Sequence, residues 1–123
     1  MKLKFLSIIH QNGEDNKIEF EVEYQKAVDG KFTSYDFLDP QSKDKNRIEI
    51  SEDEINIFSS NASIFLAYQN EVDFEYEIGE QSISLTSHWT FKDFNDTKYQ
   101  FKYSLSSSGM EIGNYDITIE LIK

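Results

Sequence analysis

Apolar and polar residues alternate along most of this chain, and the alternation is strictest in its last third. A period of two places successive side chains on opposite faces of a β-strand, so residues of one parity share a face. Three segments keep this pattern, over residues 83–91, 99–105 and 115–121. We therefore expect three long strands that fold back on one another, each with an apolar face that must be covered.

The first two thirds of the chain predicts shorter strands separated by turns. The turn signals include Asp29-Gly30, Gly79-Glu80 and the polar group Ser59, Ser60 and Asn61. The segments between them are residues 2–10, 18–24, 32–38, 48–50, 55–57, 64–68 and 72–78. About ten strands with turns every 8 to 12 residues are typical of an all-β barrel or sandwich.

The connections between these segments are short, which favours pairing of strands that are neighbours in the chain. The chain has 123 residues, a usual size for one domain. We therefore predict a single all-β domain over residues 1–123, an up-and-down barrel of about eight to ten antiparallel strands. Closure of the barrel would remove the unpaired strand edges of an open sheet.

The composition of the chain excludes several classes of binding partner and of chemical site. Twenty-three acidic residues against twelve basic ones give a formal charge of −11, so phosphate backbones and anionic lipids are repelled. We expect no nucleic acid and no membrane as partners. Cysteine is absent, which excludes disulfides, thiolate metal sites and cysteine nucleophiles. The apolar run at residues 5–9 is too short for a secretion signal or a bilayer span, and we expect a cytoplasmic location.

No catalytic pattern stands out among the polar residues. His10 and His88 have no partner at metal-ligand spacing, and neither a serine elbow nor a phosphate-binding glycine loop occurs. Four carboxylates, those of Glu71, Asp73, Glu75 and Glu77, alternate with apolar residues and belong on an outer face, with Lys98 and Lys102 as neighbouring counter-charges. We therefore expect no catalytic residue, no metal and no cofactor, and a protein that is not an enzyme.

The barrel interior is predicted to be rich in aromatic side chains. The residues on the inward parity include Phe20, Tyr24, Phe74, Tyr76, Trp89, Phe91, Tyr99, Phe101, Tyr103 and Tyr115. A barrel of about eight strands has room for packed side chains or for one small ligand. Two interpretations follow. Either Phe74, Ser87, Trp89 and Tyr103 line a lumen that binds a small apolar or aromatic molecule, or the barrel is solid and serves as a protein-interaction or structural module.

Two further features refine these interpretations. The one arginine, Arg47, lies on the parity opposite Ile48 and Ile50 and should face solvent, so a guest is expected to be neutral or cationic rather than a fatty acid. Leu6, Ile8 and Ile122 are apolar on outward parities and are candidates for a surface patch or a homodimer contact.

Several short segments also carry a family resemblance. They are Ser34-Tyr35, residues 48–57, Gly79-Glu80 before Ile83 and Leu85, residues 99–105 and residues 114–118. In their order and spacing the chain resembles the YwiB-like family of uncharacterised small bacterial proteins. That resemblance implies a calycin-type, lipocalin-like barrel and a cytoplasmic protein, and it implies no reaction. The chain departs from the family at Ser59, where the family tends to have arginine, and at Thr97, where it tends to have glycine.

Overall fold

The computed structural model describes residues 1–59 and 62–122, and the predicted turn at Ser60 and Asn61 and the side chain of Ile78 lie outside the described part. Ten strands and no helix make up the described chain. The strands are β1 (Lys2–Gln11), β2 (Glu14–Asp29), β3 (Phe32–Leu38), β4 (Lys45–Ile50), β5 (Glu54–Phe58), β6 (Ser63–Ala67), β7 (Glu71–Ile78), β8 (Gln81–Phe94), β9 (Lys98–Ser107) and β10 (Met110–Ile122). The predicted all-β class is confirmed.

Neighbours in the chain pair antiparallel at every step except from β6 to β7. The two ends of the chain also pair, because β1 runs antiparallel to β10 from Lys2 opposite Ile122 to His10 opposite Asn114. The sheet order is therefore β6-β5-β4-β3-β2-β1-β10-β9-β8-β7. This is a nearly closed up-and-down barrel, as the sequence predicts.

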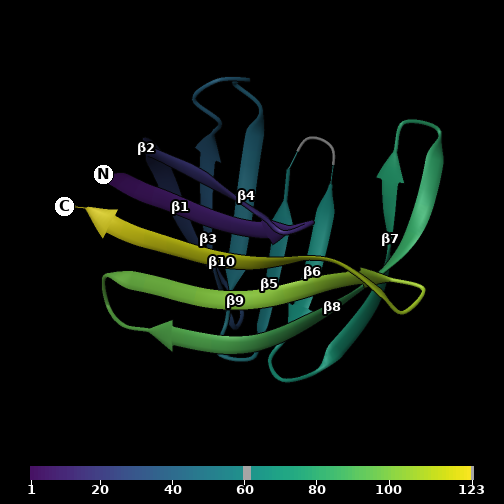
Figure 1. Ribbon diagram of the computed structural model, residues 1–123. Helices are drawn as coiled ribbons and strands as arrows, with labels where there is room; N and C mark the ends of the chain where they lie inside the picture. The colour runs from purple at the N-terminus through teal and green to yellow at the C-terminus, as the bar shows by residue number, and fades with distance from the viewer. Residues whose placement is uncertain (60–61, 123) are drawn as a thin grey trace.

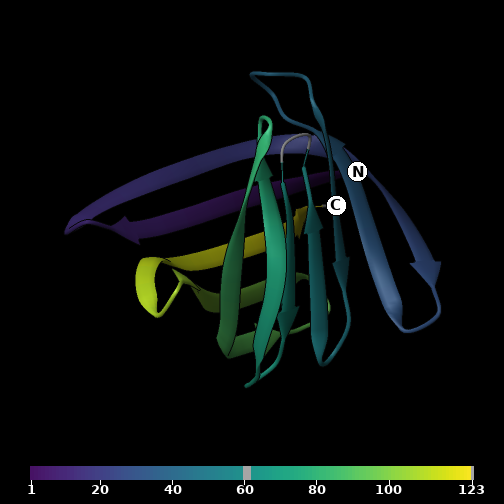
Figure 2. The same ribbon diagram turned by 90° about the vertical axis from the view of Figure 1, so that its right-hand side faces the viewer.

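The sheet folds into two layers that face each other (Figures 1 and 2). Strands β1, β10 and β9 cross over β3, β4, β5 and β6, which run in a different direction in the other layer. The long strand β2 joins the layers, since residues 14–23 pair with β1 and residues 24–29 pair with β3. Strand β8 is shared in the same way between β7 and β9. Each long strand therefore forms a corner of the barrel.

Large side chains fill the space between the layers. Leu3, Phe101 and Ile119 from one layer are fully buried, and so is Ile55 from the other. Trp89 is 0% exposed and packs its ring against Tyr68, Phe94 and Phe101, with centroids 5.0, 6.1 and 6.3 Å away. The interior is thus rich in aromatic side chains, as predicted.

A bulge in β8 corrects one predicted inward position. The register against β9 shifts between Trp89 and Phe91, and the Trp89 indole N–H donates to the Phe91 carbonyl over 2.7 Å. One extra residue reverses the faces that follow. Phe91 is therefore on the outside, 39% exposed, with the Lys102 ammonium 5.1 Å from its ring centre, and Phe94 takes the inward side. The prediction that Phe91 faces inward is wrong for this reason.

The barrel stays open along one seam, between β6 and β7. Within the described residues no ladder joins the two strands, and the isolated bridge between Ala67, the last residue of β6, and Asn70 lies in the turn before β7. Side chains and single backbone bonds connect β6 and its turn to β8 instead. The Ser87 hydroxyl donates to the Phe65 carbonyl over 2.6 Å, and the Gln69 amide donates to the Trp89 carbonyl over 2.8 Å. The expectation that closure removes every strand edge is wrong, since β8 is the one strand that pairs with β7 in the described part of the chain.

Replacing Ser87 by alanine should destabilise the protein, because it leaves the Phe65 carbonyl without its donor at a buried place. We expect the free energy of unfolding, measured by urea denaturation, to fall by about 1–3 kcal/mol. The matched control is Ser107→Ala, which removes a hydroxyl that donates to the Ser84 carbonyl at an exposed position. That control should change stability by about 0.5 kcal/mol or less. Equal effects of the two substitutions would contradict this account of the seam.

Candidate functional site

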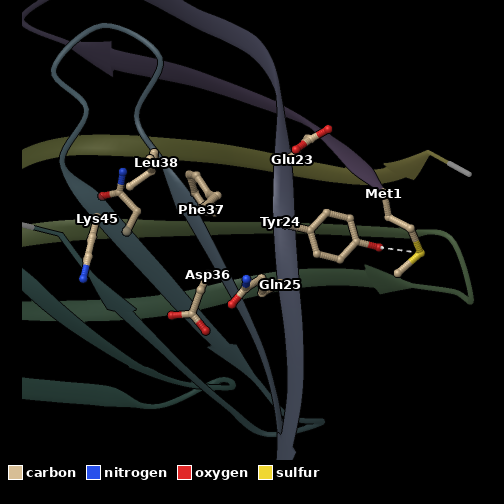
Figure 3. Close-up of a pocket in the computed structure, with 9 residues that line it drawn as sticks. Met1, Glu23, Tyr24, Gln25, Asp36, Phe37, Leu38 and Lys45 are labelled. Carbon is tan, nitrogen blue, oxygen red and sulfur yellow. Dashed lines mark hydrogen bonds between the residues drawn. The ribbon is translucent and has the colours of Figure 1, made fainter.

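A hollow of about 630 Å³ lies at the corner where β2 passes from β1 to β3 (Figure 3). It is lined by Met1, Glu23, Tyr24, Gln25, Asp36, Phe37, Leu38, Lys45 and Asn46. Strands β2, β3 and β4 therefore supply all but one of its lining residues. We call it the corner hollow.

The strand register explains why the hollow forms here. On β2, Glu23 is the last residue that pairs with β1, and Tyr24 opposite Phe37 begins the pairing with β3. Leu38, the last residue of β3, pairs with Lys45 of β4 and has no partner on β2. The loop after β3 is then held by Asp39, whose carboxylate accepts the backbone N–H groups of Gln41 and Ser42. These bonds lower the pKa of Asp39 and give the hollow an ordered edge.

Aromatic side chains form the inner part of the corner hollow. Phe37 is 7% exposed and lies against Phe5 and Phe20, with ring centres 6.3 and 6.0 Å apart. Tyr24 meets Tyr35 edge-on at 5.6 Å, and its hydroxyl donates to the Met1 sulfur over 3.9 Å. In Figure 3 Tyr24 extends from β2 toward Met1. The apolar side of the hollow is therefore continuous with the core.

Charged side chains surround this apolar side. Asp36 accepts a hydrogen bond from Arg47 over 3.4 Å, and Arg47 also bonds Glu49 over 3.1 Å. The side chains of Glu23 and Lys45 make no hydrogen bond or ion pair within the described part of the chain. Arg47 lies outside the barrel, opposite the buried Ile48 and Ile50, as predicted. The corner hollow can thus offer an aromatic surface, two carboxylates and one ammonium group to a guest.

A second hollow of about 310 Å³ lies between the β4–β5 turn and the β8–β9 turn. Its lining consists of Lys31, Thr33, Ile50, Ser51, Glu52, Phe94, Asn95, Asp96 and Tyr99. Lys31 is already paired with Asp53 at 3.3 Å and with Glu54 at 2.7 Å. These bonds raise the pKa of Lys31 and lower that of Asp53. Because these charges already have partners, the second hollow offers a guest less than the corner hollow.

The four residues predicted to line a lumen lie elsewhere in the barrel. Ser87 and Trp89 are fully buried, and their polar atoms bond to the backbone of Phe65 and Phe91. Tyr103, 5% exposed, stacks on Tyr115 with ring centres 4.9 Å apart, and Phe74 is half-buried. None of the four lines either hollow. Their role as ligand contacts stays a prediction.

The apolar residues predicted as a surface patch are also separated. Leu6, Ile8 and Ile122 are half-buried, and Ile122 pairs with Lys2 at the far end of the β1–β10 ladder from Ile8. Lys4 and Glu120, which pair with each other, lie between them. A homodimer contact through these three residues stays a prediction. Among the described residues, no group of histidines and carboxylates converges to hold a metal ion, and no helix could cross a membrane.

Sequence reasoning assigned Tyr24 to the interior and did not predict the corner hollow. The alternation in the sequence covers only residues 18–24 of β2, whereas the strand has sixteen residues and its partner β1 has ten. The part of β2 that continues beyond β1 therefore leaves no such pattern in the sequence. The fold alone shows that β3 takes over the pairing and adds Phe37, Leu38 and Lys45 to the hollow.

Comparison with known proteins supports the fold and leaves the activity open. No family model matches the chain. An uncharacterized protein of Mycoplasmopsis pulmonis is 27% identical over 126 residues, covering 100% of both chains. Among solved structures, the ywiB protein from Bacillus subtilis has a similar fold, with a TM-score of 0.70 and 18% sequence identity. That match covers 99% of this chain and 91% of the other.

Two buried tyrosines make the stability of the folded state depend on pH in the alkaline range. Burial raises the pKa of Tyr35, as does the 2.7 Å hydrogen bond between its hydroxyl and that of Tyr99, and burial also raises the pKa of Tyr103. The pKa of a tyrosine in the unfolded chain is about 10. The folded state therefore keeps these protons at a pH where the unfolded state has lost them, and stability falls as the pH rises above that value.

We expect the free energy of unfolding to be insensitive to these groups below about pH 10 and to fall above it by up to about 1.4 kcal/mol per pH unit for each retained proton. Tyr103→Phe should make the fall less steep. Urea denaturation across the alkaline range measures the slope. A slope that Tyr103→Phe does not alter would refute the assignment.

Proposed function

We propose that this protein is a non-enzymatic binding protein for a small molecule, which sits in the corner hollow between β2, β3 and β4. The observation that carries the proposal is the hollow itself. Its volume of about 630 Å³ lies within the range of about 300–1,000 Å³ usual for ligand pockets. It combines an apolar side next to the core with polar groups, of which the Glu23 and Lys45 side chains have no partner among the described residues, and apolar walls with a few polar groups are the usual composition of such a pocket.

The lining favours one chemical class of guest. The ring of Tyr24 offers a face for an aromatic or apolar body or for a cation. A carboxylate guest would have to compete with Asp36 and Glu49 for Arg47, which bonds both of them outside the barrel. The guest is therefore a neutral or cationic molecule with an aromatic or apolar part.

The comparisons suggest no enzymatic activity. The protein of similar sequence is uncharacterized, and the protein of similar structure supports only the fold. The side chains that line the corner hollow supply contacts and hydrogen bonds, and no nucleophile and base face each other there. We place the protein in the cytoplasm, as the resemblance to the YwiB-like family implies. The formal charge of −11 supports partners other than nucleic acid and anionic membranes.

Native mass spectrometry of the protein purified from its own host tests whether a guest exists. A reproducible additional small mass is the expected result. The same sample, stripped by partial denaturation and refolding, should lose that mass, and a host extract of small molecules should restore it. Protein that carries no small mass before or after exposure to the extract would refute the proposal.

The location of the site can be tested with phenyltrimethylammonium as a probe. We expect saturable binding that Tyr24→Ala weakens about tenfold, because the substitution removes the ring that faces the cation. The matched control is Tyr76→Ala, which removes a half-buried tyrosine from the β7–β8 hairpin and should leave the affinity unchanged. Calorimetry measures both affinities.

The emission of the single tryptophan separates this site from the barrel interior. Trp89 is fully buried and does not line the corner hollow, so its emission should not change when the probe binds. A change of Trp89 emission that saturates with the probe would move the guest to the predicted lumen residues. Saturable binding of laurate that is lost in Arg47→Ala would overturn the proposed class of guest.

A further inference from the structure

Strand β7 has a free edge. It pairs with β8 on one side, and within the described chain no strand pairs with it on the other side beyond the Ala67–Asn70 bridge. The two-residue turn Gly79-Glu80 joins β7 to β8, with Ile78 opposite Gln81. Such a turn closes on a hydrogen-bonded pair, and hydrogen-bonded pairs then alternate along the ladder. The backbone groups of Asp73, Glu75 and Glu77 therefore point to the free edge.

This edge diverges from β6. The bridge between Ala67 and Asn70 lies in the turn before β7, and the β7–β8 hairpin then extends away from the rest of the barrel (Figures 1 and 2). Strand β6 has five residues, and the carbonyl of its central residue, Phe65, is occupied by the Ser87 hydroxyl. A free edge of this length exposes backbone donors and acceptors that can pair with another chain.

An aromatic row crosses the seam beside this edge. Phe58 of β5 meets Phe65 of β6 edge-on at 5.9 Å, and Phe65 meets Phe74 of β7 at the same distance. All three rings are half-buried. Ile83, opposite Tyr76 on the same hairpin, is 37% exposed. An added strand would find apolar contacts for the side chains on one of its faces here.

The other face of β7 is acidic and lacks internal counter-charges. Asp73 and Glu75 accept hydrogen bonds from Thr86 and Ser84 of β8, which hold the two carboxylates in place. No lysine or arginine of the described residues pairs with them, and Lys102, one of the counter-charges expected from the sequence, lies 3.9 Å from Asp116 instead. Carboxylates would face carboxylates if two copies of β7 paired, which disfavours a second copy of this chain. The edge is complementary to a basic strand.

We propose that the free edge of β7 is a β-strand addition site for an extended segment of a partner protein in which apolar residues alternate with lysine or arginine. The main chain of the segment would pair with Asp73, Glu75 and Glu77. Its basic side chains would meet the carboxylates of β7, and its apolar side chains would meet the aromatic row. Backbone pairing supplies the binding, and the alternation of side chains supplies the selectivity.

The test adds a seven-residue synthetic peptide, in which lysine alternates with valine, to the full chain. Amide hydrogen exchange of the protein is then measured with and without the peptide. On binding, the amide hydrogens of Asp73, Glu75 and Glu77 should gain protection. Those of Val72, Phe74 and Tyr76 already bond β8 and should change little. A peptide that alternates glutamate with valine is the matched control and should not bind. Binding of the lysine peptide without protection at Asp73, Glu75 and Glu77 would show charge attraction alone and overturn the proposal.

Variants separate the backbone contribution from the charge. Glu75→Gln removes one charge and should weaken binding of the lysine peptide by about threefold at low salt. Glu75→Pro also removes a backbone donor on the free edge, a place where proline is tolerated, and should weaken binding by more than about tenfold. Equal effects of the two substitutions would overturn the proposal, provided that urea denaturation finds both variants folded. Should Glu75→Pro not fold, the same comparison is made with a peptide N-methylated on the edge-facing side.

This site is independent of the corner hollow. Tyr24→Ala should leave binding of the lysine peptide unchanged, because Tyr24 lies on β2 and the peptide binds at β7. Failure of the small-molecule tests would therefore not bear on the strand-addition site, and a peptide affinity that falls in Tyr24→Ala would place the peptide at the hollow and overturn the proposal made here.

Discussion

The antiparallel pairing of the two ends of the chain determines where this barrel closes and where it remains open. Because β1 pairs with β10, the chain ends lie in the middle of the sheet, and the sheet order has β6 and β7 at its two limits. The connection between these two strands is a turn of three residues, Tyr68 to Asn70, followed by divergence. The seam therefore lies between two strands in the middle of the sequence. Instead of a backbone ladder, a hydrogen bond from the Ser87 hydroxyl to the Phe65 carbonyl connects β8 to β6 there.

The filled interior explains why both proposed binding sites lie at the surface. Trp89, Phe101 and Tyr103 occupy the space between the two layers, and the polar atoms of Trp89 and Ser87 are already bonded to the chain. Close packing of this kind leaves a guest few places, and they are found where the regular pairing of strands stops. The corner hollow lies where β2 changes partners, and the free edge lies where β7 has a single partner.

The acidic character of the protein gives both places the same preference. Of its ion pairs, Lys4–Glu19, Arg47–Asp36 and Lys102–Asp116 lie on outer faces and neutralise part of the charge. The carboxylates of β7 and that of Glu23 at the hollow have no ion-pair partner in the described chain. The guest proposed for the hollow is therefore neutral or cationic and the segment proposed for β7 is basic, while the groups that would recognise them differ. Aromatic rings on β2 and β3 suit a compact molecule, and an exposed backbone suits an extended one.

The sequence by itself determined the strands and the faces of most residues, because alternation with a period of two is a local property. The burial of Trp89 and Tyr103 and the outward position of Arg47 follow from parity in this way. The tertiary structure decided everything that depends on a shift of one residue or on contacts between distant strands. The bulge after Trp89 turned Phe91 outward, since one extra residue reverses parity. The pairing of β1 with β10, the open seam and the corner beside Tyr24 depend on which strands meet in space, and no period along the chain encodes that choice.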